Sequence, residues 1–171
     1  MDLSDVLKGR RSVRKYKSGP VPNDIVQTLI DAAENAPSAG NLRARKYIAV
    51  TRPETRKALA VASYGQRQID SAPLIIVVCA DVDRSSSRYG DRGSLYAIQD
   101  ATAAVMCLLL EAYDLGLGAC WNGAFDDDLA RDILGIEDHM LPIALISIGW
   151  PAEEPTAPQK RNMEEVLIWM D

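Results

Sequence analysis

Residues 95–115 read LYAIQDATAAVMCLLLEAYDL, the longest stretch of the chain that favours one continuous helix. Between Asp100 and Glu111 this stretch holds no charged residue. A helix that is apolar on all sides is normally buried on all sides. In a chain of 171 residues, a second subunit is a natural source of that cover. The stretch therefore predicts a central helix, ended by Gly116-Leu117-Gly118, and favours a homodimer.

Before the central helix, the sequence alternates between helical and strand patterns. Helices are predicted over residues 2–8, 22–36, 53–62 and 66–71, and strands over residues 46–50 and 72–80. The second strand is a continuous apolar run, which is typical of a strand covered on both faces. Thr51-x-x-Glu54 matches a capping box at the start of the third helix. The polar segment 81–93, with three consecutive serines, predicts a loop.

The remaining elements are shorter. Residues 127–134 predict a helix, capped by Asp126 and closed by Gly135. Residues 142–149 predict a last strand, and residues 151–171 form a proline-rich tail. No internal repeat or linker is present, so residues 1–171 are expected to form a single domain.

Composition restricts the function. The hydrophobic share is 47% and the charged share 25%, as in ordinary soluble globular proteins. A net charge of -5 argues against nucleic acid as the main partner. Three cysteines without a C-x-x-C pair indicate reduced thiols, and the N-terminus is too charged for a signal peptide. The uninterrupted apolar runs 74–80 and 101–110 are shorter than the roughly 20 residues of a membrane span. We expect a cytoplasmic protein without a membrane partner.

A basic segment stands out against this acidic background. Arg10-Arg11-Ser12-Val13-Arg14 lies in a run with six cations and no acidic residue from Val6 to Asn23. Guanidinium groups suit phosphate because their donors lie in one plane. The segment predicts an anion site for one small ligand. The alternative is a solvated basic face or an arm that contacts an acidic surface.

Other motifs argue against common active sites. Gly116-x-Gly118-x-x-Trp121 fails as a dinucleotide fingerprint, because the third position is Trp and the glycines follow a helix. The aspartates lack the spacing of a calcium loop, and His139 is the only histidine, so no metal site is predicted. Cys120 is expected to be a small buried hydrophobe. With no catalytic side chain predicted, a bound cofactor fits best as the source of chemistry.

The order of short motifs resembles the FMN-dependent nitroreductase family. The matching pieces are Arg10–Arg14, Pro37-Ser38-x-x-Asn41, Gln99-Asp100, Gly116-Leu117-Gly118-x-x-Trp121-x-Gly123, Gly149-Trp150-Pro151 and the basic pair Lys160-Arg161. The resemblance implies an α+β fold with a central, mainly antiparallel sheet surrounded by helices. It also implies an intertwined homodimer with two FMN molecules at the subunit interface.

The resemblance also implies roles for individual residues. Arg10, Ser12 and Arg14, joined by Arg11, would contact the phosphate, ribityl chain and pyrimidine side of FMN. The partner subunit would supply Pro37, Ser38, Ala39 and Asn41. Gln66 would reach the pyrimidine edge, the backbone at Asn122-Gly123 would face the hydride-accepting nitrogen, and Arg161 would return to the phosphate.

The implied activity is hydride transfer from NADH or NADPH, through FMN, to a nitroaromatic, a quinone or a similar small acceptor, with ping-pong kinetics. Alternatives are specialised flavin chemistry (flavin fragmentation, dehalogenation or azoline oxidation), a non-catalytic flavin carrier or redox sensor, and a site for another anion or a protein. The chain departs from the family after Asn41, where Arg43-Ala44-Arg45 replaces Gln-Pro-Trp. Arg43, Arg45 and Arg88 are candidates for binding the additional phosphate of NADPH.

Overall fold

A computed structural model describes residues 1–170. The elements in chain order are α1 (Leu3–Gly9), α2 (Asn23–Glu34), β1 (Arg45–Val50), α3 (Pro53–Ala62), α4 (Arg67–Ser71), β2 (Leu74–Asp81), α5 (Val82–Tyr89), α6 (Gly93–Asp114), β3 (Gly118–Asn122), α7 (Asp127–Leu134) and β4 (Met140–Gly149). The strands form one sheet in the order β1-β2-β4-β3, and all neighbours are antiparallel. The predicted α+β class with a mainly antiparallel sheet is confirmed.

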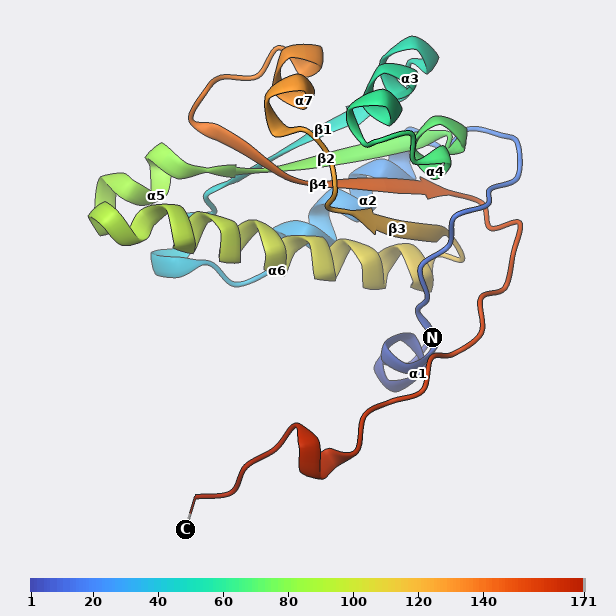
Figure 1. Cartoon of the computed structure of the whole chain (residues 1–171). Coiled ribbons are helices and arrows are strands. Elements are labelled where there is room, and N and C mark those ends of the chain that lie inside the picture. The colour runs from blue at the N-terminus through green and yellow to red at the C-terminus, as the bar shows by residue number, and fades with distance from the viewer. Residues whose placement is uncertain (171) are drawn as a thin grey trace.

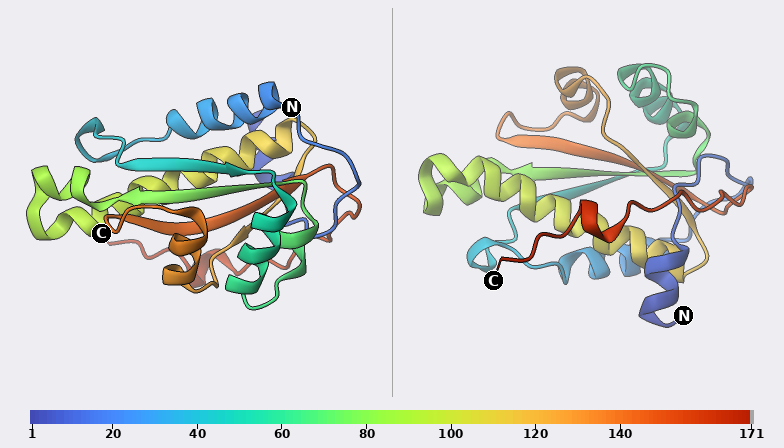
Figure 2. Two further views of the ribbon diagram at one scale, coloured as in Figure 1. Left: turned by 90° about the horizontal axis from the view of Figure 1, so that it is seen from above. Right: turned by 60° about the horizontal axis from the view of Figure 1, so that its bottom comes forward.

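Helices cover both faces of the sheet (Figures 1 and 2). α2 and α6 lie on one face, and α3, α4 and α7 lie on the other. β2 supplies both cores in alternation, because successive strand residues point to opposite faces. Leu74, Ile76 and Val78 pack with α2 and α6, whereas Ile75 and Val77 pack with α3, α4 and α7. This alternation explains the continuous apolar run of β2.

The central helix is observed as α6, but only part of its surface is buried. Ala97, Ala104 and Leu108 are fully buried against the sheet and α2. Leu95 and Met106 are 45% and 39% exposed, so the predicted burial on all sides does not occur within one protomer. By length and composition, the helical segment Val82–Asp114 could also cross a membrane, although the uninterrupted apolar runs are shorter. Here its buried side chains belong to the core of the sheet.

Two local predictions are wrong. Residues 81–93 are not a loop: they form α5 and the 3₁₀ turn Gly90–Arg92. The Asp81 carboxylate caps α5 by accepting a 2.9 Å hydrogen bond from the Arg84 amide, and Ser85 is buried. A short, polar helix of this kind carries little apolar periodicity. The capping box at Thr51 also fails, because α3 begins after Arg52 without a side-chain cap and Pro53 occupies its first turn.

A buried ion pair joins α2, β1 and α6. The Arg45 side chain is 0% exposed, and its Nη1 donates to Asp100 Oδ1 over 2.5 Å. Its Nε donates to Glu34 Oε1 over 2.9 Å, and its Nη2 donates to the carbonyls of Glu34 and Ala36. Asp100 also accepts from the Ala44 amide over 2.8 Å. These bonds fix both ends of the segment that joins α2 to β1.

Two further groups complete this network. The Tyr47 hydroxyl donates to Glu34 Oε1 over 2.9 Å. Burial acts to raise the pKa of Glu34, but the hydrogen bonds from Arg45 and Tyr47 outweigh it and lower that pKa. Burial and the bond to Glu34 raise the pKa of Tyr47. Glu34 is therefore an anion and Tyr47 a neutral donor at neutral pH.

Replacing Arg45 by Met is expected to reduce the free energy of unfolding by about 3–5 kcal/mol, because Asp100 is left charged and buried. Urea denaturation at pH 7 measures this change. Arg52→Met removes an exposed arginine and should change stability by less than about 0.5 kcal/mol. Equal effects of the two substitutions would contradict the structural role of Arg45.

Glu34→Gln should destabilise the protein in a pH-dependent way. Folding lowers the pKa of Glu34 from its ordinary value of 4.5. The ionised Glu34 side chain therefore stabilises the folded state fully at pH values above 4.5. This stabilisation by ionised Glu34 is lost as the pH falls through the lowered pKa of Glu34 in the folded protein. Urea denaturation of both proteins from pH 7 to pH 3 should show the stability difference shrinking with acidity. A constant difference would show that the Glu34 charge is not involved.

Candidate functional site

The arginine segment Arg10–Arg14 runs beside the edge strand β3. Ser12 pairs with Ala119 in a parallel bridge, and the Val13 amide donates to the Ala119 carbonyl over 3.0 Å. A Cβ on Gly118 would lie 2.6 Å from Val13 Cγ1, so glycine is required for this close approach. Gly118, the first residue of β3, thus allows the arginine segment to pack directly on the sheet.

Alternate side chains of the segment point to different sides. Arg10, Ser12 and Arg14 lie near the Cys120 thiol, whose pKa is raised by burial despite their opposing influence. Arg11 lies on the other side with Val13, and its Nη1 donates to the carbonyls of Lys8 and Arg10. Cys120 is buried and neutral, as predicted. Three of the predicted ligand-binding residues therefore lie together, and Arg11 is turned away from them.

Among the described residues, the guanidiniums of Arg10 and Arg14 have no direct ion-pair partner, whereas the Lys15 ammonium lies 3.9 Å from Glu153 Oε2. Within residues 1–170, neither Arg10 nor Arg14 has a carboxylate within 4.0 Å of its guanidinium. Glu153 instead accepts from the backbone amides of Arg14 and Lys15 over 2.6 and 3.1 Å. Glu153 positions the segment without neutralising the two guanidiniums. Glu153 was not predicted as a site residue, although it is the first acid after Gly149-Trp150-Pro151.

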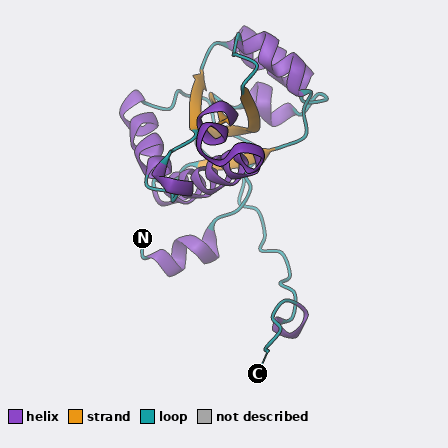
Figure 3. Cartoon of the chain, turned by 90° about the vertical axis from the view of Figure 1, so that its left-hand side faces the viewer, coloured by secondary structure: helices purple, strands orange, loops and turns teal. Residues whose placement is uncertain are grey.

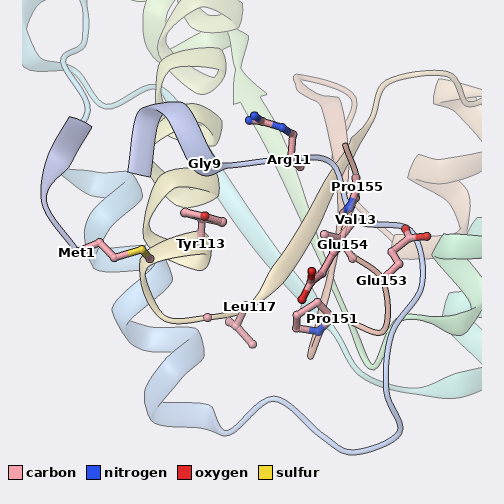
Figure 4. Close-up of a pocket in the computed structure, with 11 residues that line it drawn as sticks. Met1, Gly9, Arg11, Val13, Tyr113, Leu117, Pro151, Glu153, Glu154 and Pro155 are labelled. Carbon is pink, nitrogen blue, oxygen red and sulfur yellow. The ribbon is translucent and has the colours of Figure 1, made fainter. Parts of the chain in front are cut away.

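Arg11 borders a cavity of about 440 Å³ between α1, the end of α6 and the start of the tail (Figure 4). Tyr113 of α6 and Leu117, just after this helix, line one side of the cavity, and Pro151 and Pro155 line its tail side. This cavity contains only Arg11 of the predicted site residues. It is separate from the side occupied by Arg10, Ser12 and Arg14.

A chain of polar side chains supports the end of β3. The Tyr16 hydroxyl lies 2.9 Å from Ser147 Oγ, which lies 3.2 Å from Asn122 Nδ2. Asn122 Oδ1 accepts from Gln68 Nε2 over 2.6 Å, and Gln68 also bonds to Gln66 Oε1. The Tyr16 hydroxyl donates to the Val13 carbonyl over 2.6 Å as well. The chain therefore links the arginine segment to the turn after β3.

This chain brings two further predicted residues together. Gln66 Nε2 donates to the Ala124 carbonyl over 2.8 Å, next to exposed Gly123. The Asn122 side chain is buried and points into the sheet, where it donates to the Leu145 carbonyl over 2.7 Å. Tyr16, Ser147 and Gln68 were not predicted. Ser147 alone had a signal, as the single polar side chain in the apolar run 142–149.

The predicted residues of the second motif lie elsewhere on the protomer. Pro37, Ser38 and Ala39 line a cavity of about 230 Å³ with residues 96–103 of α6. The arginine segment begins at the other end of α6, where Gly9 packs against Tyr113. At 1.5 Å per residue, Ala103 and Tyr113 are about 15 Å apart along the helix. One protomer does not bring the two motifs together.

Three further predictions concern Arg161, metal binding and the caps of α7. Arg161 lies exposed in the tail, which extends away from the sheet and the helices that cover it (Figure 3). Its contact with a ligand remains a prediction. In the part of the chain that the structure describes, no group of three or more potential metal ligands occurs. Asp126 and Gly135 cap α7 as predicted.

The fold and the arginine segment define a helix-covered antiparallel sheet with a basic site at its edge strand. A family model described as "Nitroreductase family" matches residues 7–69 and 62–150. The chain belongs to the nitroreductase family.

Individual relatives agree with this assignment. The NADH dehydrogenase of Thermus thermophilus is 32% identical, over 99% of this chain and 96% of its own. The FMN reductase (NADPH) of Bacillus subtilis is 24% identical, over 94% of this chain and 72% of its own. A crystal structure from Parabacteroides distasonis, provisionally named NADH dehydrogenase/NAD(P)H nitroreductase, superposes with a TM-score of 0.87 at 30% identity, covering 96% of each chain.

The contact between Gly118 and Val13 can be tested by a double-mutant cycle. Gly118→Ala should destabilise the protein by about 1–3 kcal/mol, because its Cβ would collide with Val13. In the double variant with Val13→Ala, the loss should be at least about 1 kcal/mol smaller than the sum of the single losses. Strictly additive losses in urea denaturation would mean that the two residues do not touch.

Proposed function

We propose that the protein is an FMN-dependent oxidoreductase of the nitroreductase type. NADH or NADPH serves as the hydride donor, and a nitroaromatic, a quinone or a similar small molecule serves as the acceptor. Both substrates use one site in turn, which gives ping-pong kinetics. The function rests mainly on one observation: Arg10 and Arg14 lack carboxylate partners within residues 1–170, and they lie near Cys120 of the edge strand β3.

The chemistry of the donor set fits FMN. Two guanidiniums and the Ser12 hydroxyl on one side of the segment suit a phosphate and the polar ribityl chain. Arg11 adds positive potential from the other side of the segment. Gly123 is exposed and has no Cβ, so FMN could approach its backbone closely. Gln66, held at Ala124, supplies an amide for the pyrimidine edge.

When bound, FMN supplies two-electron redox chemistry, and its reduced form carries negative charge on the pyrimidine end. Arg14 places a fixed cation near that charge and so favours the reduced state. The chain of Tyr16, Ser147, Asn122 and Gln68 holds the Asn122-Gly123 backbone in a fixed direction. Water supplies protons, so no side chain has to act as an acid.

The complete site requires a homodimer. The cavity lined by Pro37, Ser38 and Ala39 lies about 15 Å along α6 from Tyr113, where the arginine segment of the same protomer begins. We therefore assign these residues, together with Asn41, to the site of the partner. The partly exposed surface of α6, with Leu95 and Met106, is available for the subunit contact. The tail leaves its own protomer, and Arg161 would then reach a phosphate through the dimer. Residues 1–171 form one FMN-binding domain in this proposal, and the protein is cytoplasmic.

The absorption spectrum of the purified protein tests the function directly. After incubation with FMN and removal of unbound flavin, the protein should show flavin bands that bleach anaerobically on addition of NADH or NADPH. An acceptor such as nitrofurazone or menadione should restore them. A protein that binds no FMN, or a bound flavin that neither nucleotide reduces, would contradict the proposal.

Arg14→Ala should weaken FMN binding and shift the two-electron reduction potential of bound FMN to more negative values. Loss of one charge-assisted hydrogen bond is worth about 1.5–3 kcal/mol, which corresponds to roughly 30–65 mV for a two-electron couple. Fluorescence titration with FMN and reduction against a reference dye measure the two effects. Lys57→Ala, which removes an exposed cation on α3, should change neither value. If the reduction potential of bound FMN were unchanged in Arg14→Ala, this would contradict the proposed role of Arg14 in favouring the reduced flavin.

A further inference from the structure

The turn that follows β3 is not fixed by the sheet. β3 ends at Asn122, and the next two residues, Gly123 and Ala124, are exposed. Within residues 1–170, neither the Gly123 amide nor the Ala124 amide donates a hydrogen bond to another group of the protein. Glycine also has the widest choice of backbone conformations. The direction of the Gly123 peptide therefore depends on how its two neighbours are held.

Two side chains at the start of α4 hold these neighbours. Gln66 Nε2 donates to the Ala124 carbonyl over 2.8 Å. Gln68 Nε2 donates to the side-chain oxygen Oδ1 of Asn122 over 2.6 Å. One bond lies on each side of Gly123, so the turn is attached to α4 before and after the glycine.

Gln68 is the common member of these contacts. Besides its bond to Asn122, its Nε2 donates to Gln66 Oε1 over 2.9 Å, so one amide group also orients the side chain that holds Ala124. The Asn122 side chain is buried, and a buried amide oxygen needs a donor. Within residues 1–170, Gln68 is the only side chain or amide that donates to Asn122 Oδ1.

The Asn122 amide group cannot turn around to accept a different neighbour. Its Nδ2 donates to the Leu145 carbonyl over 2.7 Å and to the Cys120 carbonyl over 3.0 Å. In the reverse orientation, its oxygen would face these two carbonyls, which only accept hydrogen bonds. Asn122 Oδ1 must therefore face residue 68, and the side chain at that position has to be a donor.

We propose that Gln68 is a positioning residue for the flavin: by holding Asn122 and Gln66, it sets the direction of the Gly123 peptide that faces FMN. This inference rests on the proposed function, in which the Asn122-Gly123 backbone lies beside the hydride-accepting nitrogen. Loss of the Gln68 bonds displaces that backbone, whereas Arg10 and Arg14 still bind the phosphate. The limiting rate of flavin reduction therefore falls much more than the affinity for FMN.

Replacing Gln68 by Glu tests this role, because the side chain keeps its shape and its donor becomes an acceptor. At pH 8, the limiting rate of anaerobic reduction of bound FMN by NADH or NADPH should fall about 10- to 100-fold in stopped-flow measurements. The dissociation constant of FMN should change by less than about 3-fold. At about pH 5.5, the new carboxyl group gains a proton and can donate to Asn122 Oδ1, so the rate relative to the unaltered protein should rise.

Two further variants serve as controls. Gln68→Met removes the donor without adding charge, so its rate should be lowered at both pH values without recovery in acid. Gln27→Glu introduces the same charge on the exposed side of α2 and should leave the rate unchanged.

NMR spectra of bound ¹⁵N-labelled FMN provide a readout that needs no turnover. Both Gln68 variants should shift the ¹⁵N resonance of the hydride-accepting nitrogen, because its protein neighbour has moved. The ³¹P resonance of the FMN phosphate, on the side of Arg10 and Arg14, should stay in place. A loss of packing throughout the site would shift both resonances.

The outcomes separate this inference from the proposed function. Reduction of FMN by NADH or NADPH at the same rate in the unaltered protein and both Gln68 variants would overturn the inference and keep the proposed function. Loss of FMN binding in both variants would also overturn it, because a structural role would then suffice. A ¹⁵N shift in the variants, without reduction of the unaltered protein by either nucleotide, would support the inference and overturn the proposed function. An unaltered protein that binds no FMN would overturn both.

Discussion

The ion pair between Arg45 and Asp100 is the constraint on which the functional surface depends. Two fully desolvated charges are tolerated because every side of the pair is bonded: Arg45 to Glu34 and two carbonyls, Asp100 to the Ala44 amide. The pair joins the end of α2, the start of β1 and the middle of α6. The intervening loop has left-handed backbone at Gly40, Asn41 and Arg43, and the pair thereby holds Arg43 in a conformation that is unfavourable for its residue type.

A second fixed framework supports the other half of the site. The arginine segment is seated on β3 by the Ser12–Ala119 bridge, by the missing Cβ of Gly118 and by the Glu153 carboxylate. Positive charge is left without a partner there, while the cations around Arg45 are largely paired. The protein thus separates structural arginines from those available to a ligand. The arginine segment begins near the C-terminal end of α6, whereas the Arg45–Asp100 pair lies near its middle, and this separation is why we propose that the site is assembled from two protomers.

Much of this arrangement could be predicted from the sequence. The apolar run of β2, the caps of α7 and the uncharged stretch of α6 follow from local patterns, whereas the antiparallel sheet was implied by the resemblance to the nitroreductase family. The missed features depend on contacts between distant residues. α5 is polar and is recognisable only through its Asp81 cap and its packing on α6. The prediction of Arg45 as a candidate for the NADPH phosphate is wrong, because its side chain is 0% exposed and pairs with Asp100. Nothing local in the sequence shows this pairing with a residue 55 positions away. Glu153, Ser147 and Gln68 support the site from positions far along the chain for the same reason.

Subunit complementation is the most direct test of the central claim that each site combines residues 10–14 of one protomer with residues 37–41 of the other. One variant would carry Arg10→Ala and Arg14→Ala, and a second would carry Ser38→Ala and Asn41→Ala; each homodimer should bind FMN weakly. In mixed dimers isolated by two different affinity tags, one site has all its residues and the other lacks both sets. The account predicts about one tightly bound FMN per mixed dimer. Mixed dimers that bind FMN as weakly as both parent variants would contradict a site shared between subunits.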